Sequence, residues 1–249
     1  MPVTLVVSAG QSNEVGYRVT ADQLPAYVTA INPHVFRFDP ATGGKVVLRA
    51  GVNTGTDRQP GAVGPEVAFA YGWSLAHPGE DLVFVKIAKG STGLAADPRE
   101  LDWSPRSRGE LFDQATAAVR QAKAALGVRV SGILWMQGEQ DATVAAKAAD
   151  YRENLSAMFR QMRLDWGDSG TPIVFGRISD KSRLAYGAIV RAAQDEVGRS
   201  DERAIEVATD SFAMQADRLH YSGAGQLSLG LAFHEAWRQA PQSLAGMTP

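Results

Sequence analysis

The sequence predicts an α/β fold with a mainly parallel five-stranded sheet that helices cover on both faces. Short apolar runs of strand length alternate along the chain with longer segments whose apolar residues recur at helical spacing. No repeat, linker or shift of composition divides the 249 residues, so we expect one domain spanning residues 1–249. A hydrophobic content of 45% and a charged content of 21% are ordinary for a globular protein of this size.

The first predicted strand ends in a sharp polar turn. Residues 4–9 are mostly apolar and β-branched, and Gly10 is followed at once by Gln11, Ser12 and Asn13. Open α/β sheets bind ligands at the carboxyl ends of their strands. Ser12 is therefore the candidate nucleophile.

A long irregular region, residues 14–64, follows this turn. It is rich in Gly, Pro, Asn and Thr, and it contains two short β-like pieces at 35–38 and 45–49 that lie outside the five predicted strands. An insertion of this length inside a compact domain is often a functional loop.

Gly64-Pro65-Glu66 then begins a helix that runs to about Ala76. Proline loses nothing in the first helical turn, and Glu66 suits the positive end of the helix dipole. The other elements follow from hydrophobic periodicity. The further predicted strands are 81–88, 128–136, 172–178 and 204–208, and the further helices are 111–126, one around 155–162, 184–197 and 222–240.

Small polar clusters follow other strands of the predicted sheet. Gly90-Ser91-Thr92 comes after the strand at 81–88, and Gln137-Gly138-Glu139 after the strand at 128–136. Parallel strands of one sense end on the same side of a sheet, so these clusters can meet the Ser12 turn. Acyl transfer needs a nucleophile, a base, a group that orients the base, and donors for the oxyanion.

His220 is the candidate base, because it alone among the four histidines has an acid nearby on a loop-like stretch. A turn can bring Asp217, three residues earlier, to the His220 ring. Asp217 would then fix the tautomer and leave the other ring nitrogen to accept the Ser12 proton. Taken alone, the pair could equally be a surface aspartate and a histidine that caps the last helix.

Together these residues resemble the conserved blocks of the SGNH hydrolases. The matching stretches, in the order of those blocks, are Gly10-Gln11-Ser12-Asn13, Ala88-Lys89-Gly90-Ser91-Thr92, Trp135-Met136-Gln137-Gly138-Glu139 and Asp217-Arg218-Leu219-His220. The resemblance covers roughly residues 4 to 230. It looks closest to the sialate O-acetylesterase-like and acetylxylan esterase branch, carbohydrate esterase family six, which Gly64-Pro65-Glu66 and Asp102-Trp103 also resemble.

The resemblance implies a three-layer α/β/α, flavodoxin-like fold and a two-step esterase that uses no metal and no cofactor. The implied substrate is an acetylated carbohydrate. Ser12 would be the nucleophile, His220 the base and Asp217 the group that orients it. The Ser12 and Gly90 backbone N–H groups and the Gln137 side-chain amide would hold the oxyanion.

The chain departs from this branch at Ser91, where the branch usually has a second glycine. Serine adopts a positive φ less easily than glycine, so the conformation of this loop could differ from the one that the branch usually has. Lys89 beside it adds a positive charge at the mouth of the site. Such a charge favours an acidic or strongly hydroxylated substrate.

Four further residues are candidates for support or for substrate contact. Gln11 and Asn13 could contact the substrate or bond the strand-end backbone. Glu139, which with Asp141 could be mistaken for a glycosidase pair, is expected to tie down the loop after its strand. Trp103 could be a platform for a sugar ring or an anchor for its own loop.

Other features narrow the class of protein. A net charge of −2 gives no broad electrostatic case for nucleic acid or an anionic membrane. The chain has no cysteine, no apolar run of membrane-spanning length and no signal-peptide pattern at its start. No metal-binding spacing, Gly-x-Ser-x-Gly elbow, P-loop or dinucleotide motif appears. A non-catalytic carbohydrate-binding domain and a lipase or thioesterase on the same scaffold remain the alternatives.

Overall fold

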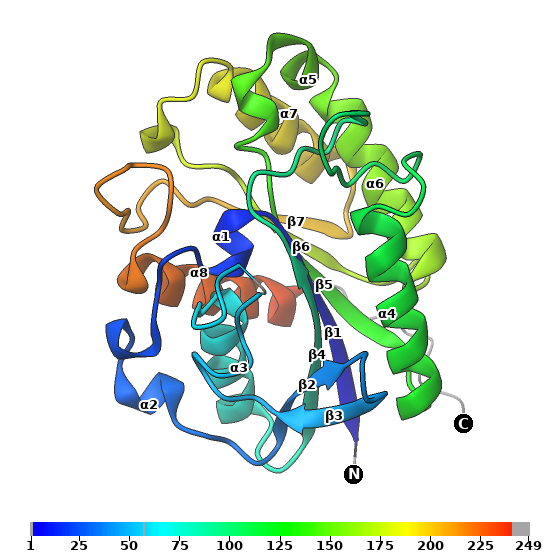
Figure 1. Ribbon diagram of the computed structural model, residues 1–249, viewed down its shortest axis with the longest axis vertical. Coiled ribbons are helices and arrows are strands. Elements are labelled where there is room, and N and C mark those ends of the chain that lie inside the picture. The colour runs from blue at the N-terminus through cyan, green and yellow to red at the C-terminus, as the bar shows by residue number, and fades with distance from the viewer. Residues whose placement is uncertain (1, 57, 241–249) are drawn as a thin grey trace.

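The computed structural model describes residues 2–56 and 58–240. Its strands form one sheet in the order β3-β2-β4-β1-β5-β6-β7 (Figure 1). The strands are β1 (Val3–Gly10), β2 (Val35–Asp39), β3 (Gly44–Val47), β4 (Asp81–Ala88), β5 (Val130–Met136), β6 (Ile173–Gly176) and β7 (Ala204–Val207). All pairings are parallel except that of β3 with β2.

The expected five strands are therefore too few, since the sheet has seven. The two β-like pieces of the long insertion extend the sheet at one edge. β2 pairs with β4, beginning at Val35 opposite Leu82, and β3 folds back on β2 as the edge strand. The local sequence shows that these pieces are extended, but their pairing depends on a strand more than forty residues away.

Helices cover both faces of the sheet, as the three-layer expectation requires. On one face α3 (Pro65–Ala76) packs against α8 (Gly223–Gln239), and the other face carries the helices that connect β4 to β7 (Figure 1). A Cβ at Gly230 of α8 would lie 2.2 Å from the Pro65 carbonyl oxygen, so glycine permits the close approach of the two helices. The connecting helices are α4 (Leu111–Leu126), α5 (Ala145–Ala149), α6 (Tyr151–Asp165) and α7 (Gly187–Ser200).

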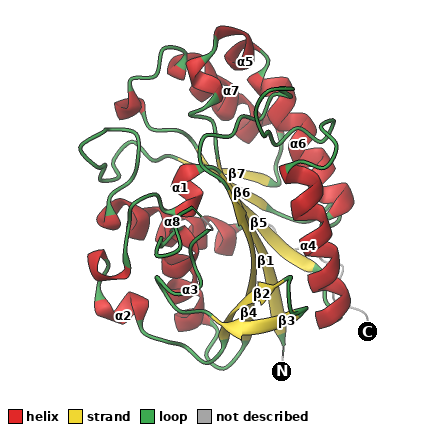
Figure 2. Cartoon of the chain, viewed as in Figure 1, coloured by secondary structure: helices red, strands yellow, loops and turns green. Residues whose placement is uncertain are grey.

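β1 lies at the centre of the sheet, and its carboxyl end determines where Ser12 lies. Its residues from Leu5 to Gly10 are buried, with β4 on one side and β5 on the other. After β1 the chain passes through β2, β3 and α3 to β4 on one side of β1, and α4 then carries it from β4 to β5 on the other side. Ligands bind at such a point where the strand order reverses. Figure 2 shows loops, together with the short helix α1 (Ser12–Val15), gathered at this end of the sheet.

Candidate active site

Gly10 makes the turn that carries Ser12. Its φ is +149°, and a Cβ there would lie 2.2 Å from the Met136 carbonyl oxygen of β5, so only glycine fits. Ser12 is the first residue of α1 and lines a cavity of about 360 Å³. The sequence-predicted nucleophile thus lies at the end of the central strand, beside open space.

Gly90 lines the same cavity and lies next to Ser12. A Cβ on Gly90 would be 3.5 Å from the Ser12 Cβ. The loop is fixed to the turn because the Lys89 N–H donates to the Gly10 carbonyl oxygen at 3.0 Å. Ser91 lines the cavity too, with a φ of +59°. The serine therefore adopts the left-handed conformation that glycine takes without strain.

Asp217 and His220 form the expected pair. Asp217 Oδ2 lies 2.8 Å from His220 Nδ1, and Oδ1 accepts from the backbone N–H groups of Leu219 and His220 at 2.9 and 3.0 Å. Burial acts to raise the pKa of Asp217, but these hydrogen bonds outweigh it and bring the pKa to about 2. Asp217 is thus a carboxylate at neutral pH, and its bond to Nδ1 leaves His220 Nε2 for other contacts.

Asn13 binds the loop of this pair directly to α1. Its Nδ2 donates to the Leu219 carbonyl oxygen at 3.1 Å, and its Oδ1 accepts from the Tyr221 N–H at 3.0 Å. The residue after Ser12 therefore holds the two residues that flank His220. Asn13 was considered either for substrate contact or for bonding to the backbone, and the structure shows the bonds to the backbone. Gln11 is similar, because its Oε1 accepts from the Gly138 and Gln140 N–H groups at 3.3 Å.

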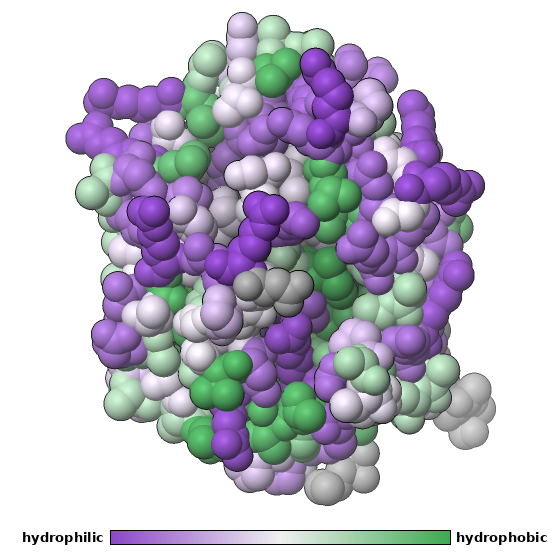
Figure 3. Space-filling model, in the orientation of Figure 1, coloured by the Kyte–Doolittle hydropathy of each residue, from purple (hydrophilic) through white to green (hydrophobic). Residues whose placement is uncertain are grey.

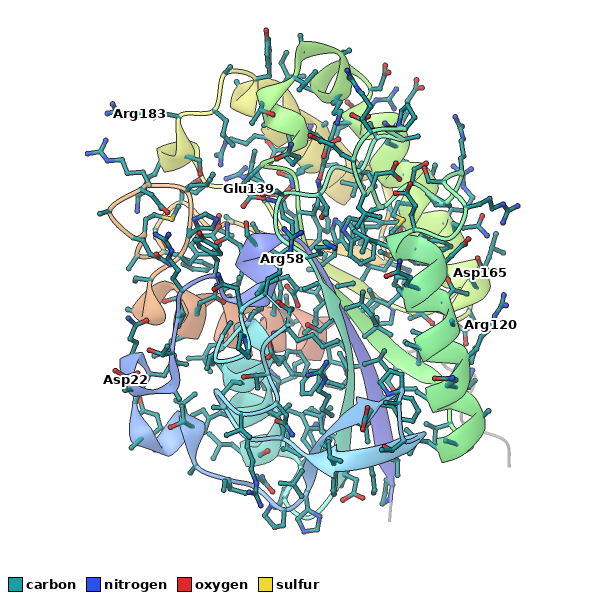
Figure 4. The ribbon with its side chains drawn as sticks, in the orientation of Figure 1. Asp22, Arg58, Arg120, Glu139, Asp165 and Arg183 are labelled. Carbon is teal, nitrogen blue, oxygen red and sulfur yellow. The ribbon has the colours of Figure 1, made fainter. Side chains whose placement is uncertain are left out.

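Glu139 supports Asn13 from the loop after β5 (Figure 4). Its Oε1 accepts from Asn13 Nδ2 at 2.5 Å, and burial raises its pKa to about 7 against the opposing effect of hydrogen bonds. Asp141 accepts from the Leu94 and Ala95 N–H groups at 2.8 and 3.1 Å. Each of the two carboxylates thus bonds groups of the protein itself, Glu139 at α1 and Asp141 at the loop after β4.

The Gln137 amide is bound within the protein. Nε2 donates to the Thr92 carbonyl oxygen at 3.1 Å and to Asp141 Oδ2 at 2.6 Å, while Oε1 accepts from the Tyr151 hydroxyl at 3.0 Å. The side chain has no exposed surface. Both hydrogens of the Gln137 amide therefore have acceptors, and a substrate oxygen could bind the amide only by replacing one of them. The Thr92 carbonyl oxygen, which is farther from Nε2 than Asp141 Oδ2, is the acceptor to replace. The oxyanion role of Gln137 stays a prediction.

Trp103 is an anchor for its loop. The residue has no exposed surface, its indole N–H donates to Thr92 Oγ1 at 3.1 Å, and its ring packs edge-on against Trp135 at a centroid distance of 5.1 Å. A platform for a sugar ring must expose a face, which Trp103 does not. Its contact with Thr92 stabilises the loop that carries Gly90.

Sequence reasoning missed two residues at the cavity wall. Tyr17 stacks on the His220 ring at a centroid distance of 4.2 Å, and Arg58 lies over α1 (Figure 4). Both belong to the long insertion, where no pattern marks a residue that will meet the site. Arg58 and Lys89 both line the cavity and make no ion pair within the described part of the chain.

A third missed residue, Lys86, lies buried beneath the cavity. Its Nζ donates to Glu66 Oε1 at 2.7 Å and to the Thr54 carbonyl oxygen at 2.8 Å. Glu66 is thus buried with a charged partner, in addition to its place in the first turn of α3. A signal for this pair was available, because a lysine in the apolar run of a central strand needs a partner.

The described residues hold no group of three or more His, Asp or Glu side chains placed to bind a metal ion. Among the same residues, no helix combines the length and the apolar character needed to cross a membrane.

The fold is that of the SGNH-type acylhydrolases. A lipase/acylhydrolase from Enterococcus faecalis has a TM-score of 0.52 at 12% identity, covering 98% of this chain and 99% of that one. A solved protein from Arabidopsis thaliana superposes with a TM-score of 0.81 at 22% identity, over 97% of this chain and all of that one. NanS gives 0.72 at 16% identity, over 96% and 97% of the two chains.

The sequence comparison places the chain more narrowly. Residues 2–239 match the model of the family described as "Carbohydrate esterase, sialic acid-specific acetylesterase", and the chain belongs to this family. A probable carbohydrate esterase from Arabidopsis thaliana is 25% identical over 175 residues, which are 70% of this chain. The matched part is 63% of the length of that relative.

Proposed function

We propose that the protein is a serine esterase that removes small acyl groups, chiefly acetyl, from carbohydrate hydroxyls. The observation that carries the proposal is the Asp217–His220 pair, bound through Asn13 to the helix that begins at Ser12. This arrangement supplies a hydroxyl, an oriented imidazole and a buried anchor between them. Membership of a carbohydrate esterase family supports the reaction class.

In the proposed mechanism, His220 Nε2 takes the proton of Ser12 Oγ as the oxygen attacks the acetyl carbonyl carbon. The Asp217 carboxylate steadies the imidazolium that forms. The Ser12 and Gly90 N–H groups donate to the tetrahedral oxyanion, with Gln137 as the third donor. The C–O bond to the sugar then breaks, the sugar oxygen takes the proton from His220, and acetyl-Ser12 remains.

Water completes the cycle through the same groups. His220 Nε2 takes a proton from water as its oxygen attacks the acyl carbon, and the second oxyanion is held in the same way. Ser12 then leaves with the proton, and acetate is released. Two half-reactions through one acyl-enzyme predict ping-pong kinetics.

The lining of the cavity supports a sugar as the alcohol. Arg37, Arg58, Gln59 and Lys89 surround it and provide many hydrogen-bond donors. Cationic side chains at the mouth favour a sugar that carries a carboxylate, such as the sialic acid in the name of the family.

Ser12→Ala and His220→Ala test the mechanism. We expect each to lower turnover of p-nitrophenyl acetate by at least about 10³-fold, as removal of a triad member does in serine hydrolases. The exposed Ser200→Ala on α7 is the matched control and should keep its activity. A serine-reactive phosphonate should label the original protein and the control, but not Ser12→Ala. Unchanged turnover in purified Ser12→Ala would refute the proposal.

A series of p-nitrophenyl esters separates the alternatives. For an acetylesterase, kcat/KM should fall steadily as the acyl chain lengthens from acetate to octanoate. For a lipase or thioesterase, kcat/KM should rise over the same series. A non-catalytic carbohydrate-binding domain should hydrolyse none of them faster than Ser12→Ala does.

A further inference from the structure

A second cavity, of about 560 Å³, lies beside the loop that carries Asp217 and His220. That loop and the segment after β6 form its wall. The lining residues are Asp180, Lys181, Arg183, Met214, Gln215 and Arg218. None of them takes part in the mechanism above, and Arg218 directly follows Asp217.

A hydrogen bond and a ring contact connect this second cavity to the Ser12 cavity. Tyr17 lines the Ser12 cavity and stacks on His220. The Tyr17 carbonyl oxygen accepts from Gln215 Nε2 at 2.7 Å, and Gln215 lines the second cavity. Tyr17 therefore connects the linings of the two cavities, and its ring contacts the candidate base His220.

Both cavities are positively charged, although the whole chain has a net charge of −2. Among the described residues, the lining of the Ser12 cavity includes Arg58 and Lys89 and no Asp or Glu. The second cavity has three cationic side chains and one acid, Asp180. In contrast, cationic side chains elsewhere, such as Arg163 and Arg191, bind carboxylates at 2.6 to 2.9 Å.

The backbone is also unusual at these cavities. Four non-glycine residues in the described chain have φ between +47° and +59°, namely Arg18, Ser91, Arg183 and Arg218. Ser91 lines the first cavity, Arg183 and Arg218 line the second, and Arg18 lies against the Tyr17 ring at 5.0 Å. Left-handed backbone is costly for such residues and is concentrated at functional sites.

Cationic residues from both cavities are labelled in Figure 4. Arg58 of the Ser12 cavity is drawn near α1, and Arg183 of the second cavity projects from the segment after β6. Figure 3 shows hydrophilic side chains extending across this region of the face, from the centre to the upper left. A chain of linked acidic sugars could therefore contact both groups of cations at once.

We propose that the substrate is an acetylated acidic oligo- or polysaccharide that extends from the Ser12 cavity, past His220, to the second cavity. The acetylated sugar occupies the Ser12 cavity, and the carboxylate of a linked sugar binds Lys181 and Arg218 in the second cavity. The inference rests on the proposed esterase function and adds to it a subsite outside the reacting sugar. Arginine and lysine bind carboxylates through charge-assisted hydrogen bonds, which a neutral chain would not provide.

Acetylated oligogalacturonides of one to six sugars test this subsite, with the same oligomers after reduction of their carboxyl groups to alcohols as neutral partners. We expect kcat/KM for acetate release to rise about fivefold from monomer to tetramer in the acidic series, since an exposed charge pair supplies an effect of this size. The rise should disappear in the reduced series and should weaken at high salt. An equal rise in the reduced series would overturn the proposal.

Variants assign the effect to the second cavity. Within each variant the tetramer-to-monomer ratio of kcat/KM is compared, so that a general loss of activity cancels. The double variant Lys181→Gln/Arg218→Gln should bring the ratio close to one, while Lys181→Arg/Arg218→Lys should keep most of it. The exposed Arg160→Gln on α6 is the control and should keep the full ratio. A full ratio in the charge-removed variant would also refute the subsite.

Binding separates failure of the subsite from failure of the esterase. Calorimetry measures the affinity of Ser12→Ala for the unacetylated tetragalacturonide, with and without Lys181→Gln/Arg218→Gln. The subsite predicts about fivefold weaker binding when the two charges are removed. Equal affinities would overturn the subsite. Absence of hydrolysis of every ester would instead overturn the proposed function.

Discussion

At the scale of single residues, Ser91 shows how a departure from a family pattern is accommodated. The sequence placed a serine where a second glycine is usual, and the structure gives it a φ of +59°. The neighbouring Gly90 still lies against Ser12. The loop therefore keeps its geometry, and the strain is confined to one residue whose side chain is exposed.

Ser91→Gly should raise the free energy of unfolding by about 0.5–1 kcal/mol. It removes the steric cost of left-handed backbone, which exceeds the extra entropy of glycine in the unfolded chain. Urea denaturation measures the change. Ser91→Ala, which keeps the Cβ, is the control and should stay within about 0.5 kcal/mol of the original. Equal stability of the Gly and Ala variants would show that the backbone at residue 91 is not strained.

Sequence reasoning was strongest for residues whose partners are near in the chain. Asp217 and His220 are three residues apart, and their pairing was expected and found. It was weakest where the partner is distant. Nothing local shows that Gln137 will bond Asp141 and Thr92, or that Tyr17 will stack on His220. Such contacts are set by how loops from different strands meet.

At the scale of elements, α1 is only four residues long and depends on its contacts for its position. Asn13 connects it to the loop that carries Asp217 and His220 and to the loop after β5. Gln226 Nε2 of α8 also donates to the Asn13 carbonyl oxygen at 2.8 Å. The helix that positions Ser12 is thus fixed to three other segments through one residue. Asn13 is a positioning residue in the proposed reaction.

Asn13→Leu should lower kcat for p-nitrophenyl acetate by about 10²-fold while KM changes little. Loss of the bonds to Leu219 and Tyr221 frees the His220 loop from α1, and a misplacement of about 1 Å is enough for such a loss. Steady-state kinetics measure both constants, and circular dichroism checks that the variant is folded. A rise in KM with an unchanged kcat would show that Asn13 binds substrate instead.

Elements that repeat a clear period were predicted close to their observed bounds. α3 and α4 match the expected helices, and β1, β4, β5, β6 and β7 lie where the apolar runs indicated. The sequence missed the pairing of β2 and β3 with the sheet, and it missed α5 and the start of α6 at Tyr151. These segments are short or polar, so packing rather than periodicity decides their structure.

At the scale of the whole molecule, buried ionisable side chains link α1 to the core. Glu14 of α1 accepts a hydrogen bond from Ser8 of β1, and Glu66 pairs with Lys86 nearby. The Lys86 ammonium group is thus paired with Glu66 and also attracts the Glu14 carboxylate. Burial raises the pKa of Glu14 to about 8, against the lowering effects of Ser8 and Lys86. Glu14 is therefore mostly protonated in the folded protein at neutral pH.

This raised pKa makes stability depend on pH. A carboxyl whose pKa is near 4.5 when unfolded and about 8 when folded binds its proton more tightly in the folded state. Its contribution is complete below about pH 4.5 and is lost as the pH rises toward 8. Glu139, with a folded pKa of about 7, acts in the same direction. We therefore expect the melting temperature to fall between pH 5 and pH 8.5.

Glu14→Gln should make this fall smaller, because the amide keeps a hydrogen-bonding partner for Ser8 and cannot ionise. Each unit of pKa shift corresponds to about 1.4 kcal/mol, so the change is large enough to measure by thermal unfolding across this range. Glu196→Gln on the exposed face of α7 is the matched control and should keep the original pH dependence. If Glu14→Gln and Glu196→Gln give the same slope, Glu14 is not protonated in the folded protein at neutral pH, and the raised pKa is wrong.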